Sequence, residues 1–412
     1  MKYGCIGEHL PHSFSKEIHA HLASHEYELR ELTPNEVGAF LTKHDFLGIN
    51  VTIPYKQTVM PYLDEIDDSA KRIGAVNTIV NRNGKLYGYN TDFGGMRAMI
   101  LHEEIDLNHK KVLIFGTGGT SKTARAVAES LGAGEIVVVS RSAKDGAITY
   151  ADAYELHADA DAIINTTPVG MYPKIDAMPA DMERFPNLSA VVDAIYNPLR
   201  SELVLWAQSR GIKATGGLYM LVAQAVLASS HFTGIEYNEK MMDEVFRAIF
   251  SDKENIVLVG MPGSGKSTVG EILGRFLNRP LIDTDAWIVE KSGMAISDIF
   301  AKYGESHFRR LEHEAIAEIS ARSGCVIATG GGAVLNPANI HALRKNGRIY
   351  FLDRPLEELL PTDDRPLANS ADAIRARYHE RYDIYCTSCD VHVHTLGEAL
   401  LTAKEIQRRH QS

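Results

Sequence analysis

Two glycine-rich loops, each placed directly after a short apolar run, constrain what this chain can fold into. The first run and its loop read KVLIFGTGGTSKT over residues 111–123, and the second read NIVLVGMPGSGKST over residues 255–268. A strand that ends in such a loop and continues into a helix presents backbone N–H groups to a phosphate. The sequence therefore predicts two separate nucleotide sites, each on its own α/β sheet.

The segment 111–217 alternates short apolar runs with helical stretches. Five runs bounded by Gly, Asn or Pro indicate buried parallel strands; they read KVLIFG, EIVVVS, DAIINT, AVVDAIY and GIKATGG. The stretch SKTARAVAESLGA between the first two ends at Gly132 and predicts the crossover helix of a βαβ unit. We therefore expect a Rossmann-like nucleotide-binding domain over residues 102–217.

A second series of the same kind begins near residue 255. Its predicted strands read NIVLVG, PLIDTD, CVIATGG, GRIYFLD and DVHVHT. They indicate a P-loop domain with a five-stranded parallel sheet over residues 255–412. The helical stretch MMDEVFRAIFSDKEN separates the two series, so we expect the main boundary near residues 251–254. Residues 1–101 form a further α/β unit, completed by helices at about 218–250.

The overall composition limits the classes of partner. A net charge of −10 over 412 residues argues against nucleic acids and anionic membranes, which need a basic face. The chain has no run of about 18 apolar residues, and its first residues lack the apolar core of a secretory signal. Its four cysteines are too few for a disulfide framework. We expect a cytoplasmic protein that acts on small molecules, and the sequence leaves homo-oligomer formation open.

One cluster offers possible zinc ligands. Cys386, Cys389, His392 and His394 follow each other as C-x-x-C-x-x-H-x-H. Structural zinc sites usually space their ligand pairs further apart. The segment DVHVHT alternates like a strand, which puts both histidines on one face. We therefore expect a pair of histidines packed on a sheet, with zinc as the less favoured alternative.

The loop GTGGTSKT fits two kinds of nucleotide site. It departs from the ATP pattern G-x-x-x-x-G-K-[ST] and from the dinucleotide pattern G-x-G-x-x-G at Ser121. A dinucleotide site places a ribose-reading residue at the end of the next strand. That strand ends at Arg141 with no acidic residue beside it, which favours the 2′-phosphate of NADP. A glycine-rich turn without a ligand is the alternative. The residues predicted to hold NADPH or NADP are Gly116, Thr117, Gly118, Gly119, Thr120, Ser140, Arg141 and Ser142.

Seven ordered segments of residues 1–248 resemble shikimate dehydrogenase. They are HSFS (12–15), NVTIPYK (50–56), GAVNT (74–78), GYNTD (88–92), NTTPVGM (165–171), DAIYNP (193–198) and GGLYMLVAQA (216–225). The resemblance implies NADPH-dependent reduction of 3-dehydroshikimate to shikimate.

Lys56 and Asp92 make chemical sense for such a reduction. A ketone needs a hydride on carbon and a proton on oxygen, and an ammonium held by a carboxylate can supply that proton. By resemblance Lys56 is the general acid and Asp92 its partner, whereas each residue alone would be read as a solvated surface charge.

The same resemblance implies the other residues of this first site. Ser13 and Ser15 bind the substrate carboxylate, although either could instead cap the helix that follows. The ring hydroxyls are held by Thr52, Asn77, Tyr196 and Gln224. Gly217 and Met220 lie near the nicotinamide, where a methionine is otherwise a common core residue.

The run GMPGSGKST (260–268) is a complete phosphate loop. Backbone N–H groups can cradle the phosphates of ATP, Lys266 can reach the β- and γ-oxygens, and Ser267 can ligate Mg²⁺. The residues predicted to hold ATP are Gly263, Ser264, Gly265, Lys266, Ser267 and Thr268.

Five later segments resemble shikimate kinase over residues 255–412. They are DTD (283–285), FRRLE (308–312), GGGAV (330–334), DRPLA (364–368) and RYDIY (381–385). The implied roles are Mg²⁺ binding through water for Asp283, and contact with a ring hydroxyl and action as base for Asp285. Arg309 and Arg381 would bind the substrate carboxylate, and Gly331 would abut the ring. Arg365 would close on the phosphates, Glu312 would orient Arg309, and Arg310 is the expected helix-surface arginine.

Together the resemblances imply a bifunctional enzyme that makes shikimate and then phosphorylates it to shikimate 3-phosphate. The cofactors would be NADPH or NADP, ATP and Mg²⁺. Two alternatives are a quinate-preferring dehydrogenase that uses NAD, and a non-catalytic sensor of pathway metabolites. Arg141 argues against the first, and retention of the reactive residues argues against the second.

Overall fold

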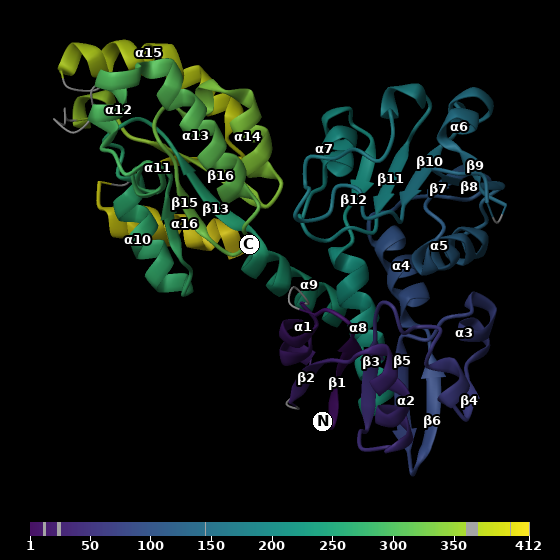
Figure 1. The fold of residues 1–412 in the computed structure, drawn as a ribbon. Coiled ribbons are helices and arrows are strands. Elements are labelled where there is room, and N and C mark those ends of the chain that lie inside the picture. The colour runs from purple at the N-terminus through teal and green to yellow at the C-terminus, as the bar shows by residue number, and fades with distance from the viewer. Residues whose placement is uncertain (11–13, 23–25, 145, 360–369, 396, 412) are drawn as a thin grey trace. The chain divides into compact units, whose positions relative to one another are not determined.

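The computed structural model describes residues 1–10, 14–22, 26–144, 146–359, 370–395 and 397–411. The chain divides into two compact units, Met1–Ile249 and Phe250–Ser412 (Figure 1). Among the described helices, none combines the length and apolar character needed to cross a membrane.

The first unit begins with a mixed six-stranded sheet in the order β2-β1-β3-β5-β6-β4. Its strands are β1 (Tyr3–Gly7), β2 (Tyr27–Glu31), β3 (Gly48–Val51), β4 (Glu65–Ile66), β5 (Thr78–Arg82) and β6 (Lys85–Tyr89). Its helices are α1 (Ser15–Leu22), α2 (Pro34–Thr42), α3 (Asp68–Ile73) and α4 (Thr91–His102). Ile6, Ile49 and Ile79 are fully buried on three neighbouring strands and form part of its core.

A tight turn reverses the chain between β5 and β6. The turn is Asn83–Gly84, and both residues have positive φ angles, of 54° and 85°. An Asn-Gly pair is the usual solution for a two-residue hairpin, because both positions need left-handed backbone. The hairpin pairs Thr78 with Tyr89, so that the residues before β5 and after β6 lie side by side. This places Asn77 next to the start of α4.

A second, fully parallel six-stranded sheet follows, in the order β12-β11-β10-β7-β8-β9. Its strands are β7 (Lys111–Phe115), β8 (Glu135–Ser140), β9 (Ile148–Thr149), β10 (Ala162–Asn165), β11 (Ala190–Asp193) and β12 (Lys213–Thr215). The helices around it are α5 (Gly119–Ser130), α6 (Tyr150–Leu156) and α7 (Glu202–Ser209). The five predicted apolar runs are β7, β8, β10, β11 and β12, which confirms the Rossmann-like fold. The two-residue strand β9 was not predicted.

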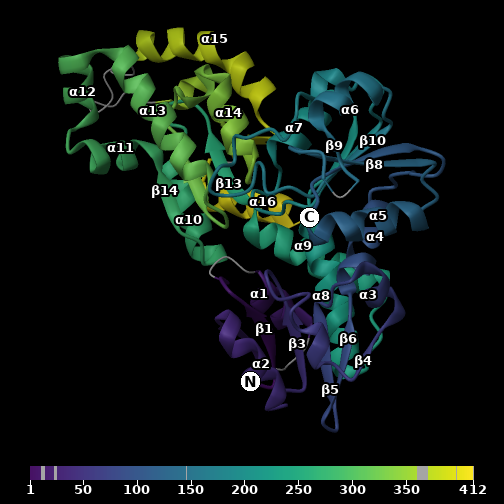
Figure 2. The same cartoon turned by 45° about the vertical axis from the view of Figure 1, so that its right-hand side comes forward.

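Two helices connect the sheets of the first unit. Figures 1 and 2 both show α4 and α8 (Leu218–Thr233) between these sheets. Met96 and Met220 pack in the core under the parallel sheet, whereas Phe232, the penultimate residue of α8, packs with Cys5 of β1. The helix therefore contributes to the cores of both layers. Helix α9 (Glu239–Lys253) follows it.

The second unit is a parallel five-stranded sheet in the order β14-β15-β13-β16-β17, which confirms the predicted P-loop fold. Its strands are β13 (Asn255–Val259), β14 (Leu281–Asp283), β15 (Val326–Ala328), β16 (Gly347–Asp353) and β17 (Val391–His394). Its helices are α10 (Lys266–Leu277), α11 (Thr284–Ser292), α12 (Ile296–Tyr303), α13 (Glu305–Ser320), α14 (Pro337–Arg344), α15 (Ala371–Ser388) and α16 (Ala399–Gln411). Alternate residues of β13 enter two different cores, because successive side chains of a strand face opposite sides.

Candidate active sites

A cavity of about 440 Å³ lies in the first unit. The structure brings together on its wall most residues predicted for the first substrate, namely Ser15, Thr52, Lys56, Asn77, Asp92, Tyr196 and Gln224. Three residues predicted for the dinucleotide line it as well: Thr120, Gly217 and Met220. The sequence analysis missed His9, Asn50, Tyr172 and Asn197, which line the same cavity. Ser13 lies outside the described residues.

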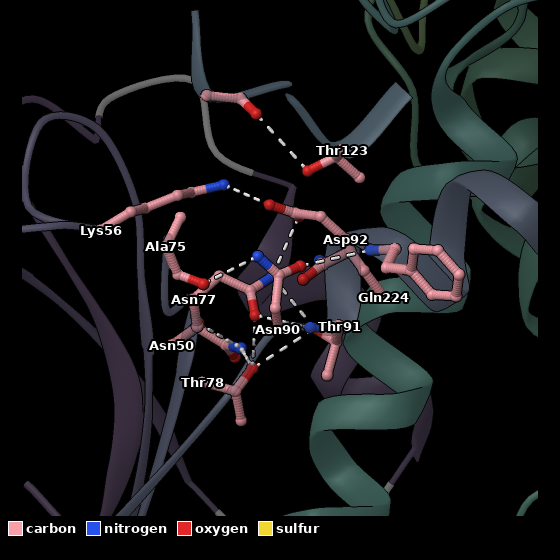
Figure 3. A network of polar contacts seen from close by, with 12 residues as sticks. Asn50, Lys56, Ala75, Asn77, Thr78, Asn90, Thr91, Asp92, Thr123 and Gln224 are labelled. Carbon is pink, nitrogen blue, oxygen red and sulfur yellow. Dashed lines mark hydrogen bonds and ion pairs between the residues drawn. The ribbon is translucent and has the colours of Figure 1, made fainter. Parts of the chain in front are cut away.

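Lys56 and Asp92 form an ion pair at this cavity, and Figure 3 shows their side chains pointing toward one another. Lys56 Nζ lies 2.6 Å from Asp92 Oδ2, with 24% of the lysine side chain and 14% of the aspartate side chain exposed. Asp92 occupies the first turn of α4, where the positive end of the helix dipole favours a carboxylate. The pair is therefore partly shielded from solvent, which strengthens its electrostatic attraction.

Asn77 holds the second oxygen of Asp92. Its Nδ2 donates to Asp92 Oδ1 at 2.9 Å and to Thr91 Oγ1 at 3.0 Å, and its Oδ1 accepts the backbone N–H of Thr91 at 2.8 Å (Figure 3). Asn90 caps α4 by accepting the N–H of Phe93. Both carboxylate oxygens of Asp92 are thus fixed by side chains that come from different loops.

A buried polar chain stands behind Asn77. Tyr27 donates to Asn50 Oδ1 at 2.6 Å, and Asn50 Nδ2 donates to Thr78 Oγ1 at 3.2 Å. Thr78 in turn donates to Asn77 Oδ1 at 3.1 Å. Burial raises the pKa of Tyr27, so its hydroxyl stays a donor at any ordinary pH. Asn50 lies in a motif noted above, but no sequence signal linked it to Tyr27.

The remaining cavity residues combine apolar and polar groups. The ring of Tyr196 meets Phe14 edge-on at 5.3 Å, and burial raises the pKa of its hydroxyl. Gln224 donates its amide to the backbone oxygen of Leu221 at 2.9 Å. Ser15 opens α1, so the structure gives it both a place at the helix start and a place on the cavity wall. Burial raises the pKa of the Cys5 thiol to about 12, so it is not a reactive thiolate.

The glycines of the first loop differ in what surrounds them. Gly116 has a φ of 108°, and a side chain there would collide with Thr166. A Cβ at Gly118 or Gly119 would meet no atom within 4 Å, so these two positions border open space. Gly118 is the N-cap of α5, whose first N–H groups are available to an anion. Lys122 is exposed on this helix.

A short turn follows β8 at the predicted ribose position. Ser140 Oγ donates to the backbone oxygen of Ser142 and accepts its N–H at 3.2 Å, which fixes the turn. Arg141 between them is exposed. β8 lies beside β7, whose end carries the glycine loop, so both groups sit at the same edge of the sheet. A dinucleotide could therefore reach from the loop to this cation.

The second unit contains a cavity of about 350 Å³ around the phosphate loop. It is lined by Gly263, Gly265, Lys266, Ser267, Thr268, Asp283, Asp285 and Gly331, all of which were predicted, and by Pro262, Thr329 and Arg354, which were not. Lys266 Nζ donates to the backbone oxygens of Gly260 and Met261, both at 2.9 Å. The loop therefore curls around the lysine that is expected to contact phosphate.

The two residues predicted to bind magnesium lie together. Ser267 Oγ donates to Asp283 Oδ2 at 2.7 Å. Asp283 Oδ1 accepts the N–H groups of Asp285 and Ala286, at 3.0 and 3.2 Å, and so caps α11. A hydroxyl and a carboxylate oxygen are hard ligands of the type that Mg²⁺ takes. This pair fits the ion that the phosphate loop implies.

Arg309 and Arg381 are the predicted carboxylate-binding residues. Arg309 contacts Glu312 Oε2 at 2.8 Å, as predicted, and Glu305 Oε1 at 3.0 Å, which the sequence did not indicate. Arg310 pairs with Glu314 on the helix surface, as expected. Arg381 is almost fully buried and donates to the backbone oxygen of Gly331 at 3.1 Å. Burial raises the pKa of Glu312, an effect that the nearby Arg309 opposes.

Arg354 is a cation that the sequence analysis missed. It follows β16, its Nη1 lies 3.5 Å from the backbone oxygen of Gly263, and its Nε pairs with Glu358 at 3.2 Å. It lines the phosphate-loop cavity together with Lys266. The predicted lid residue, Arg365, lies outside the described residues.

Family models match part of each unit. Residues 5–79 match the shikimate dehydrogenase substrate binding domain, and residues 262–410 match shikimate kinase. The shikimate dehydrogenase (NADP(+)) of Clostridium beijerinckii is 36% identical over 268 residues, covering 61% of this chain and 98% of that protein. The enzyme of Geobacillus kaustophilus is 37% identical over 254 residues, covering 56% and 92%.

Solved structures of shikimate dehydrogenases also match this chain. Shikimate dehydrogenase 1 from Peptoclostridium difficile matches with a TM-score of 0.56 and 35% identity, over 60% of this chain and 98% of that chain. A chorismate mutase/shikimate 5-dehydrogenase fusion protein from Clostridium acetobutylicum matches with a TM-score of 0.57 and 34% identity, over 60% and 96%. The chain therefore belongs to the shikimate dehydrogenase family and joins to that enzyme a shikimate kinase domain, as a bifunctional enzyme of the shikimate pathway.

Proposed function

We propose that this chain reduces 3-dehydroshikimate to shikimate in the first unit and phosphorylates shikimate to shikimate 3-phosphate in the second. The observation that carries the proposal is that one chain contains two separate cavities of different chemistry. One holds the Lys56–Asp92 pair, and the other holds a phosphate loop with Ser267 and Asp283. The product of the first reaction carries the hydroxyl that the second reaction uses.

In the first cavity Lys56 donates a proton to the carbonyl oxygen as the ketone becomes an alcohol. NADPH, held by the glycine loop and Arg141, supplies the hydride. Asp92 aims the lysine ammonium into the cavity, and Asn77 keeps Asp92 in place. Ser13, Ser15, Thr52, Asn77, Tyr196 and Gln224 bind the substrate carboxylate and hydroxyls, and Met220 borders the nicotinamide.

In the second cavity Asp285 accepts the proton of the substrate hydroxyl. Arg309 and Arg381 bind the substrate carboxylate, for which a planar guanidinium is well suited. Lys266 and Arg365 stabilise the phosphate charge, while Ser267 and Asp283 hold the Mg²⁺ that accompanies ATP. Most of the rate enhancement then comes from positioning and charge neutralisation, as is general for phosphoryl transfer.

We also propose functional domains within the two units. Residues 1–101, with helices at about 218–250, bind the substrate of the first reaction, and residues 102–217 bind NADP. Residues 255–412 form the kinase. An enzyme with these soluble metabolite substrates fits a cytoplasmic location, and a homo-oligomer is compatible with it.

One assay tests the proposal as a whole. The purified chain receives 3-dehydroshikimate, NADPH and MgATP, while NADPH absorbance and ADP formation are followed together. Both signals should appear, and omission of NADPH should abolish ADP formation until shikimate is added. ADP formation from 3-dehydroshikimate without NADPH, or no ADP with shikimate, would contradict it. A parallel arm with quinate and NAD⁺ should give much slower turnover than shikimate and NADP⁺.

A further inference from the structure

A group of metal-ligating side chains lies at one edge of the second unit, outside both cavities. His392 and His394 stand two residues apart on β17, so their side chains share one face of the strand. Asp353 ends the neighbouring strand β16, and the register pairs it with His394. The topology therefore brings two imidazoles and one carboxylate to a single spot on the sheet.

The distances within this group are short. Asp353 Oδ2 lies 2.8 Å from His392 Nε2 and 3.2 Å from His394 Nδ1. One ligand atom from each of the three residues lies within 4.8 Å of the others. The carboxylate is 10% exposed, His392 is 33% exposed and His394 is 77% exposed, so the group opens to solvent on one side.

We propose that Asp353, His392 and His394 bind a divalent transition-metal ion, with zinc as the preferred ion, and leave a fourth position for water. Zinc bonds to histidine nitrogen and carboxylate oxygen are about 2.0–2.2 Å long, so tetrahedral ligand atoms stand about 3.3 Å apart. The observed carboxylate–imidazole distances are within about half an ångström of that value. Two imidazoles and a carboxylate suit zinc better than magnesium or calcium, which prefer oxygen ligands only.

Binding requires no covalent change in the protein. Each neutral imidazole moves its proton to the ring nitrogen that faces away from Asp353, and the nearer nitrogen then offers its lone pair to the ion. The ionised carboxylate of Asp353 supplies the third bond and one negative charge. Zinc would thus bridge the two rings and the carboxylate.

Neighbouring groups already hold two of the ligands in place. Tyr382 on α15 donates to Asp353 Oδ2 at 3.2 Å, and the ring of His392 packs against Phe351 at a centroid distance of 4.9 Å. Such outer partners orient the ligands of a metal site and restrict their motion. The ion would tie the edge strand β17 to β16 by bonds stronger than the backbone ladder between them.

The ligand set differs from the one that the sequence suggests. Cys386 and Cys389 lie at the end of α15, and the metal-ligating group found in the described part of the chain does not include them. The carboxylate that completes the histidine pair comes from a residue 39 positions earlier in the chain, which no local motif could reveal.

A cobalt titration of the full chain tests the proposal. The protein is prepared without a histidine tag, stripped of metal, and kept in excess Mg²⁺ to occupy the site at Ser267 and Asp283. Co²⁺ should then give the intense visible absorption of a four-coordinate site at one equivalent, and Zn²⁺ should displace it. Calorimetry with Zn²⁺ should give the same stoichiometry.

Four variants locate the site. His394→Gln, at a side chain that is 77% exposed, and Asp353→Asn should each weaken binding at least about tenfold. His379→Gln, an exposed histidine of the same unit, and the double variant Cys386→Ser with Cys389→Ser should bind as the native chain does. Absence of an equivalent in the native chain, unchanged binding by His394→Gln, or loss of binding in the cysteine variant would each overturn the proposal.

Discussion

The ammonium of Lys56 and the carboxylate of Asp92 meet at 2.6 Å although 36 residues separate them in the chain. Lys56 lies in the loop after β3, and Asp92 opens α4, which the β5–β6 hairpin positions. The contact holds the lysine charge at the cavity while leaving part of the side chain open to a ligand.

Lys56→Ala should abolish ketone reduction, since it removes both the proton donor and the partner of Asp92. We expect kcat to fall by about 10²–10⁴-fold, the range typical for loss of a general acid. Kinase activity with added shikimate should not change, because that cavity lies in the other unit. Lys122→Ala, on the exposed face of α5, is the matched control and should leave both activities intact.

Tyr27→Phe should weaken the polar chain behind the Lys56–Asp92 pair. The change leaves Asn50 Oδ1 without the donor that now lies 2.6 Å away, and loss of such a buried hydrogen bond costs about 1–3 kcal/mol. We expect a lower unfolding midpoint of the first unit and a raised KM for shikimate, with a smaller change in kcat. Tyr62→Phe, on an exposed tyrosine, should alter none of these values.

Lys266→Ala should impair the kinase reaction and leave the reductase reaction intact. Without its ammonium the phosphate loop loses the cation that neutralises charge on the transferred group, and kcat for phosphorylation should fall at least about a hundredfold. NADPH oxidation with 3-dehydroshikimate should continue at the native rate. Normal ADP formation in this variant would show that the phosphate loop is not the site of transfer.

Asp193 should make the first unit less stable as the pH rises. Burial raises the pKa of this carboxyl to about 6, although Ser201, the N–H of Ile195 and Asn165 donate to it. The folded state therefore keeps a proton that the unfolded chain loses near pH 4, and stability falls between about pH 4 and pH 6. Asp193→Asn should remove this dependence, which amounts to up to about 3 kcal/mol.

Trp206 makes the Asp193 prediction measurable. It lies on α7, which Ser201 caps, and Trp287→Phe would leave it as the chain's one tryptophan. Urea unfolding of the Trp287→Phe protein, followed by the fluorescence of Trp206, should give a larger free energy of unfolding at pH 4.5 than at pH 7. The same protein with Asp193→Asn added should not show this difference. If the free energy of unfolding changed equally with pH in the two proteins, Asp193 would not be the group responsible.

His410 should make the second unit less stable as the pH falls. Burial, with a smaller contribution from Arg279, lowers the pKa of this imidazole to about 4. The folded state is therefore fully stable above about pH 6.5, and stability is lost as the pH falls toward 4 because the unfolded chain gains the proton first. In a Trp206→Phe background, Trp287 fluorescence should report this loss, and His410→Gln should reduce it.

Local sequence patterns were enough to predict most strands and helices and part of each candidate site. The phosphate loop needs only consecutive residues, so Lys266 and Ser267 were predicted in place, and the motif DTD brought Asp283 with them. The Asn83–Gly84 turn was also readable in principle, since Asn-Gly marks a tight hairpin. Features of this kind are specified by neighbours in the chain.

Contacts between distant segments could not be predicted in this way. Tyr27 supports Asn50 from a neighbouring part of the sheet, and Arg354 enters the phosphate-loop cavity from the end of β16. Neither residue stands in a motif, and their positions depend on strand order and register. Strand β9 was not predicted for a different reason: two residues are too few to show the alternation that marks a strand.

Gly217 lines the cavity of the first unit, and its lack of a side chain lets α8 pack closely against the parallel sheet. It begins α8, the helix that carries Met220 and Gln224, and a methyl group there would overlap the backbone oxygen of Ala194 just after β11. Any larger residue would push the helix away from the sheet and enlarge the cavity as a whole. An engineer who wishes to admit bulkier ketones should therefore shorten Met220 and leave that glycine untouched, because the first change adjusts one wall whereas the second would displace the entire scaffold.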